Sequence, residues 1–70
     1  MYDVIIITKQ DGVCFFFGYL EQVADWLSRV HGRQINIAEE LEAQITDVSG
    51  CDFEIDGVKY HYEQKALYEL

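Results

Sequence analysis

Apolar and polar residues along the chain predict two β-hairpins separated by two helices. The dipeptides Asp11-Gly12 and Asp56-Gly57 each lie between two runs rich in β-branched and aromatic residues. An Asp-Gly pair favours the type I′ turn of a tight hairpin, because both central residues of that turn need a positive φ. We therefore expect strands near residues 2–9, 13–18, 52–55 and 58–63.

The segment after the first hairpin has the periodicity of an amphipathic helix. Its apolar residues recur at the spacing of one helix face and are Leu20, Val23, Ala24, Leu27 and Val30. Gly32 suits the position just beyond the last helical residue. Trp26 falls beside the apolar stripe, and we expect it to be half-buried at the edge of the core.

A second helix is expected to begin after Asn36, which is a favourable N-cap residue. Glu39 stands three residues later, where the partner in a capping box belongs. The apolar stripe of this helix would consist of Ile37, Leu41, Ile45 and Val48, with Gly50 ending the segment.

These elements predict one α+β domain over residues 1–70, with the order ββααββ. Both hairpins would join an antiparallel sheet, and the two helices would pack on one face of that sheet.

The second hairpin alternates regularly between apolar and polar residues. One face holds Phe53, Ile55, Val58, Tyr60 and Tyr62, and the other holds Glu54, Lys59, His61 and Glu63. A two-residue turn also sets Asp52 opposite His61 and Glu54 opposite Lys59, which are favourable cross-strand pairs.

The first hairpin is apolar on both faces. With a turn at residues 11–12, one face holds Val4, Ile6, Thr8, Val13, Phe15 and Phe17, and the other holds Asp3, Ile5, Ile7, Lys9, Cys14 and Phe16. If the helices cover the first face, the second is left with a patch of Ile5, Ile7, Cys14 and Phe16. Exposing a large apolar side chain forgoes roughly 1.5–3 kcal/mol.

Three arrangements would cover this patch. The C-terminal segment could fold over it with Leu67, Tyr68 and Leu70, or the hairpin could be central in the sheet and shielded by neighbouring side chains. Alternatively, the patch could bind a second copy of the chain, because contiguous exposed apolar surfaces mark interaction sites. The last arrangement predicts a homodimer.

The charge balance is strongly acidic. Thirteen acids stand against five bases, for a net charge of −8. Direct binding to nucleic acid or to an anionic membrane would bring like charges together, so a basic protein surface is the expected partner. The alternative is that the acidity only keeps a small protein soluble.

Seven of the acids follow one another without an intervening base. They lie between Arg33 and Lys59 and are Glu39, Glu40, Glu42, Asp47, Asp52, Glu54 and Asp56. We call this set the acidic rim, because the first three would line helix two and the last three the adjoining strand and its turn. A row of carboxylates of this kind would suit a Lys/Arg-lined groove.

Signals for chemistry are weak. Cys14, His31, Cys51 and His61 make a Cys₂His₂ set, but they lack the close spacing of zinc ligands. A nucleophilic Cys51 with His61 and Asp52 is disfavoured, because Cys51 should face the other side of the sheet. We therefore expect no catalysis, metal or cofactor.

The cysteine content and apolar runs predict a cytoplasmic protein with reduced thiols. The run Val4–Ile7 is too short for a signal peptide or a membrane span. A small secreted domain would usually have four or more cysteines, although the sequence leaves a single disulfide open.

A short acidic α+β chain with "EELEAQITD" and "CDFEID" on one rim resembles the small inhibitors encoded by bacteriophages and other mobile elements, such as anti-CRISPR and anti-restriction proteins. This resemblance implies a non-enzymatic protein, often dimeric, that works in the host cytoplasm. It would block a nuclease or another nucleic-acid-handling protein by occupying its basic surface. The alternative is a homodimeric structural or protein-interaction module.

Overall fold

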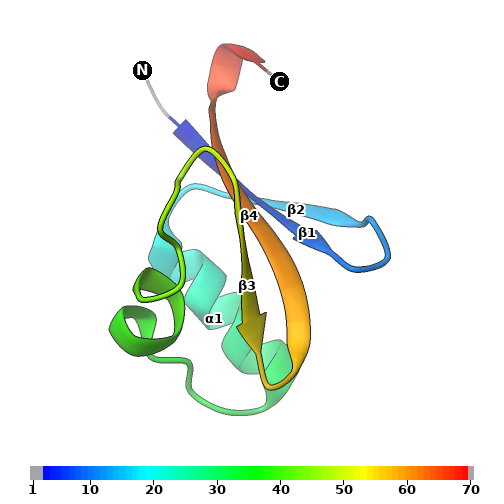
Figure 1. Cartoon of the computed structure of the whole chain (residues 1–70), viewed down its shortest axis with the longest axis vertical. Helices are drawn as coiled ribbons and strands as arrows, with labels where there is room; N and C mark the ends of the chain where they lie inside the picture. Colours follow the sequence, from blue (N-terminus) through cyan, green and yellow to red (C-terminus); the bar gives the residue numbers. More distant parts are fainter. Residues whose placement is uncertain (1–2, 70) are drawn as a thin grey trace.

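Two antiparallel hairpins join through their longer strands into one four-stranded sheet. The computed structural model describes residues 3–69, and the strand order is β2-β1-β4-β3. The elements are β1 (Asp3–Lys9), β2 (Cys14–Phe17), α1 (Leu20–His31), η1 (Ile37–Glu42), β3 (Cys51–Ile55), β4 (Val58–Ala66) and η2 (Leu67–Glu69) (Figure 1). The predicted α+β fold of order ββααββ is confirmed.

The first helix is placed as predicted, except at its last turn. Val23, Ala24 and Leu27 are buried, and the helix ends at Gly32, which has a left-handed φ of 68°. The prediction that Val30 belongs to the buried stripe is wrong, because Val30 is 56% exposed. His31, four residues after Leu27, turns inward instead and contacts the sheet through Tyr60.

The second helix is shorter than predicted. It ends at Glu42, and its last turn is widened to an i→i+5 hydrogen bond, from the Ala43 N–H to the Ala38 carbonyl at 3.2 Å. The chain leaves the helix because the Gln44 side chain bonds to the backbone of β3. Ile45 still packs against the core, whereas Val48 is exposed.

The second hairpin has the predicted register, with Ile55 opposite Val58 and positive φ at Asp56 and Gly57. The first hairpin does not have the predicted register. Its turn contains one more residue, because the Gly12 N–H bonds to the Lys9 carbonyl at 3.0 Å while the Lys9 N–H bonds to the Val13 carbonyl at 2.9 Å. This is a bulge with glycine in the left-handed position, and φ of Gly12 is 88°.

The extra turn residue changes which side chains share a face. Ile7 lies opposite Phe15 rather than Phe16, and a shift of one residue moves every side chain of one strand to the other side. The predicted surface positions of Ile5 and Ile7 are therefore wrong, since both lie in the core. Cys14 and Phe16 remain exposed, on the side of the sheet away from α1, and Phe16 is 57% exposed.

Between these exposed residues and β4, Ile6 is buried by its central position. It lies between Phe16 on β2 and Glu63 on β4. The predicted arrangement in which the whole hairpin is central in the sheet is wrong, because β2 is an edge strand. Leu67 and Tyr68 are exposed and do not cover the hairpin. Leu70 lies outside the described residues.

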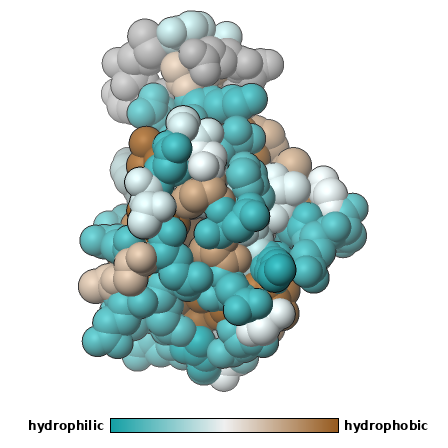
Figure 2. All heavy atoms as spheres, in the orientation of Figure 1, coloured by the Kyte–Doolittle hydropathy of each residue, from teal (hydrophilic) through white to brown (hydrophobic). Residues whose placement is uncertain are grey.

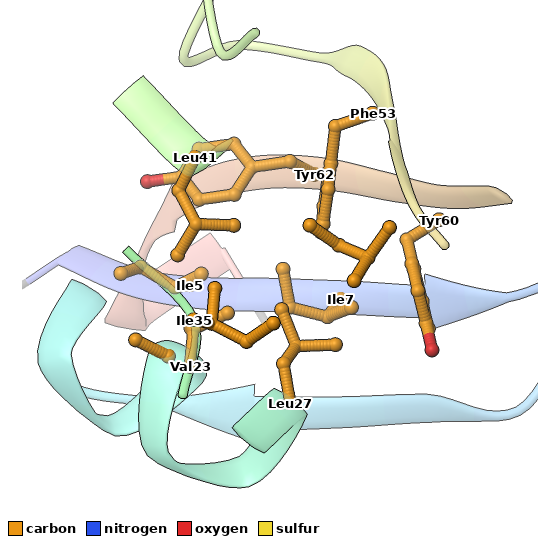
Figure 3. Close-up of a cluster of buried hydrophobic side chains, with 11 residues drawn as sticks. Ile5, Ile7, Val23, Leu27, Ile35, Leu41, Phe53, Tyr60 and Tyr62 are labelled. Atoms are coloured by element: carbon orange, nitrogen blue, oxygen red, sulfur yellow. The ribbon is translucent and has the colours of Figure 1, made fainter. Parts of the chain in front are cut away.

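The core lies between the sheet and the helices. Figure 3 shows side chains from β1, α1, the loop after α1, η1, β3 and β4 converging between the two layers. Trp26 closes one margin of this core, with its ring centroid 4.7 Å from Phe15 and 5.5 Å from Phe17. It is half-buried, as predicted.

Replacing Ile7 with alanine tests which face of β1 is buried. The side chain is fully buried, so we expect Ile7→Ala to lower the free energy of unfolding by about 2–5 kcal/mol. Val30→Ala should change it by no more than about 0.5 kcal/mol, because Val30 is on the surface. Urea denaturation followed by circular dichroism measures both values, and similar losses in the two variants would contradict this assignment of faces.

Candidate functional site: the acidic rim

The N-cap of η1 sets the position of the three glutamates in the rim. Asn36 Oδ1 accepts a hydrogen bond from the Glu39 N–H at 3.0 Å, as predicted. The reciprocal bond comes from a different residue, because Glu40 Oε2 accepts from the Asn36 N–H at 2.8 Å. Glu39 is thereby left facing solvent, and the prediction that it completes the capping box is wrong.

Gln44 joins the helical part of the rim to β3. Its side-chain amide donates to the Glu54 carbonyl at 2.9 Å and accepts from the Glu54 N–H at 2.9 Å. These two bonds hold the C-terminal end of η1 against β3. The glutamates of η1 and the acids of β3 therefore belong to the same edge of the molecule. The face shown in Figure 2 is hydrophilic over most of its area, with some apolar residues between the hydrophilic ones near its centre.

Arg33 binds two of the seven acids of the rim. Its Nη1 donates to Glu40 Oε2 at 3.0 Å, and its Nε donates to Asp56 Oδ2 at 3.0 Å. The loop that carries Arg33 is itself fixed to α1, because the Ile35 N–H donates to Ser28 Oγ at 3.1 Å. The guanidinium therefore links the start of η1 to the turn between β3 and β4.

This ion-pair cluster changes the proton affinity of both carboxylates. The hydrogen bond from Arg33, with help from the Asn36 N–H, lowers the pKa of Glu40 from 4.5 to about 2. Arg33 also lowers the pKa of Asp56. Glu40 and Asp56 are therefore charged but locally neutralised, and they stabilise the fold rather than offer free charge.

A polar contact that the sequence pattern did not reveal lies next to this cluster. The His31 side chain is only 9% exposed, with Nε2 2.8 Å from the Tyr60 hydroxyl and Nδ1 3.5 Å from Asp56 Oδ2. Burial, followed by the charge of Asp56, raises the pKa of Tyr60. In the sequence, the spacing of four residues between Leu27 and His31 was the available sign that His31 lies on the inner face of the helix.

The other five acids of the rim are exposed. Asp47 accepts hydrogen bonds from the Ser49 hydroxyl and N–H, which lower its pKa. Asp52 lies 2.8 Å from His61 Nδ1, the cross-strand contact that was predicted. Within residues 3–69, no ion pair within 4 Å involves Glu39, Glu42 or Glu54. The rim is thus a negative surface with Arg33 embedded in it and with Lys59 opposite Glu54 on the neighbouring strand.

The candidate metal and nucleophile residues are far apart. Cys14 and Cys51 are free thiols on the two outer strands of the sheet, which lie about 14 Å apart at the usual strand spacing and are too distant for a disulfide. Cys51 packs toward the core, whereas Asp52 and His61 face the opposite side. No cluster of three metal-ligating side chains occurs in the part of the chain that the structure describes.

The surface depressions are small. The one beside the Asp52–His61 pair measures about 200 Å³ and is also lined by Thr8, Lys9 and Lys59. Sites for small molecules usually measure about 300–1,000 Å³.

Among the described residues, no helix has the length and apolar character needed to cross a membrane.

Comparison of the chain with protein-family models, with curated proteins and with solved structures gives no match.

Acid titration of stability tests the cluster around Arg33. Because the pKa of Glu40 is lower in the folded protein than its ordinary 4.5, its contribution to stability is complete above that value and is lost as the pH falls toward 2. We expect Glu40→Gln to lower the stability at pH 7 and to flatten the decline between pH 4.5 and about 2. Urea denaturation at a series of pH values measures both effects.

The matched control is Glu39→Gln, one residue away and outside the cluster. It should leave the stability at neutral pH and the shape of the acid titration close to those of the parent protein. Equal effects of the two substitutions would contradict the role assigned to Arg33.

Proposed function

We propose that the protein is a non-enzymatic inhibitor that binds the basic surface of a nucleic-acid-handling protein, such as a nuclease or its nucleic-acid complex, in the cytoplasm. The observation that carries this proposal is the unequal distribution of charge. Seven acids lie on η1, β3 and the segments next to them, and one arginine neutralises two of these acids. The resemblance to small acidic inhibitors of mobile elements agrees with this use of the rim.

The exposed acids form the contact set that we assign to the target. Glu40 and Asp56 are held by Arg33 and serve the fold, so they are left out of this set. The contact set consists of Glu39, Glu42, Asp47, Asp52 and Glu54, which are all exposed. The β3 members stand on a hydrogen-bonded strand and the η1 members on a capped turn, so the backbone that carries these acids is already in position before the target arrives. Positioning before binding reduces its entropic cost.

The physical mechanism is electrostatic competition. A protein that binds nucleic acid has lysines and arginines arranged for phosphate contacts, and an array of carboxylates can satisfy the same cations. A net charge of −8 steers such an encounter and opposes direct binding of nucleic acid. Occupation of the groove by carboxylates would keep the natural phosphate ligand out.

Charge reversal on the rim tests this proposal. The test variant replaces three exposed acids that have no ion pair, Glu39, Glu42 and Glu54, with lysine. Immobilised parent protein should capture basic proteins from a bacterial lysate at low salt, release them at high salt and release them when duplex DNA is added. The triple variant should fold normally and capture none of them.

The matched control makes the same change in net charge elsewhere. Asp3, Glu21 and Asp25 are exposed acids outside the rim, and their triple replacement with lysine should leave capture intact. Asp25 does pair with Arg29, but an exposed pair of this kind contributes only about 0.5 kcal/mol. Capture that survives reversal of the rim, or that duplex DNA does not displace, would refute the proposal.

A second candidate function is an interaction module whose acidity serves solubility alone. The observation that favours it is the exposed Phe16 on the uncharged strand β2. In that case captured proteins would be retained at high salt, Phe16→Lys would abolish capture and the rim variant would not. The two functions therefore give opposite results in the same assay.

A further inference from the structure

Within residues 3–69, the outer edge of β2 has backbone groups without a hydrogen-bond partner. The Lys9 N–H bonds to the Val13 carbonyl, and hydrogen-bonded pairs in an antiparallel ladder alternate with pairs that are not bonded. Phe15 therefore directs its backbone N–H and C=O toward β1, whereas Cys14 and Phe16 direct theirs away from the sheet. Both of these residues are also exposed through their side chains.

The opposite edge of the sheet is occupied in part. On β3, the outward N–H and C=O of Glu54 are both bonded to the side-chain amide of Gln44. Nearer the chain end, where β4 extends beyond β3, the Gln64 N–H bonds to the Val48 carbonyl at 2.7 Å. Within residues 3–69, the outward backbone groups of Asp52 on β3 have no bond, but this residue is charged, whereas β2 offers two uncharged residues in this state, Cys14 and Phe16. Pairing with another strand is therefore favoured at β2.

The open edge is also the part of the sheet that a like-charged molecule can approach. The segment "VCFFFGYL", residues 13–20, has no charged residue. The acids of the rim belong to η1, β3 and their loops, and two strands separate β3 from β2. Two copies of the chain, each with a net charge of −8, can therefore meet at β2 with their acidic rims pointing apart.

We propose that β2 pairs antiparallel with β2 of a second copy, with the two-fold axis passing beside Phe15. In this register Cys14 faces Phe16 of the partner subunit, and every outward N–H meets an outward C=O. The two copies then share one continuous sheet. A second copy fits better than an unrelated strand, because residues 14 and 16 are related by the symmetry and neither brings a charge.

The side chains agree with this register. On the face of the sheet away from α1, the exposed Phe16 ring would lie across from Cys14 of the partner subunit. Each copy would thus cover an apolar group of the other. On the helix side, the two Phe15 rings would approach each other, each already packed on the Trp26 of its own chain. The interface therefore needs no rearrangement of the core.

The experiment measures mass and amide exchange on the complete chain. Sedimentation over the micromolar range should give twice the chain mass of 8.2 kDa, and the dimer should strengthen with added salt, because salt screens the repulsion between two acidic subunits. Phe16→Lys should shift the protein to the monomer, since lysine on a sheet edge opposes pairing. Val30→Lys, at a site of equal exposure on α1, should leave the dimer intact.

Hydrogen exchange identifies the edge. In the dimer the amides of Cys14 and Phe16 should exchange slowly, and in Phe16→Lys the amide of Cys14 should exchange rapidly while that of Phe15, bonded to β1, stays protected. Protection of Phe15 also shows that the variant is folded. A monomer at all concentrations, or a dimer whose Cys14 and Phe16 amides exchange rapidly, would overturn the proposal. Because target binding weakens with salt whereas this dimer strengthens, failure of one proposal is distinguishable from failure of the other.

Discussion

The hydrogen bond from the Gly12 N–H to the Lys9 carbonyl sets the register on which the rest of the structure depends. It adds one residue to the first turn and so decides which residues of β2 stand beside Ile5 and Ile7. With Phe15 and Phe17 on their side, these two isoleucines have an apolar surface that α1 can cover. A left-handed backbone at this position favours glycine, and the absence of a side chain here lets the strands continue without strain.

In the acidic half of the molecule, Arg33 has a structural role as central as that of the Gly12–Lys9 hydrogen bond. A helix start and a hairpin turn with one carboxylate each would repel one another, and the guanidinium between Glu40 and Asp56 turns this repulsion into two ion pairs. His31 and Tyr60 fill the space next to the same turn. The chain therefore uses two of its rim acids for folding, and this division between structural and free carboxylates is visible only in three dimensions.

Local patterns were sufficient for the order of elements and for the second hairpin, because each of these depends on residues close together in sequence. The helical stripe from Leu20 to Leu27 and the turn at Asp56-Gly57 are examples. The first turn could not be resolved, since Asp-Gly fits both a two-residue turn and a three-residue turn with a glycine bulge. The early end of η1 depends on Gln44 reaching β3, and the ion pairs of Arg33 join segments distant along the chain. Neither contact has a local signature.

The amide of Gln44 has a consequence for how the sheet can grow. A protein with two open strand edges can add copies at both ends and polymerise into a fibre. Here a single side chain takes the place of the next strand at one residue of β3, Glu54. Joining two copies through β2 would leave only the β3 edges facing outward, each with Gln44 bonded to Glu54 and with the charged Asp52 beside it. Addition of a third copy at these edges would be opposed, so an uncharged side chain helps the molecule to limit its own aggregation.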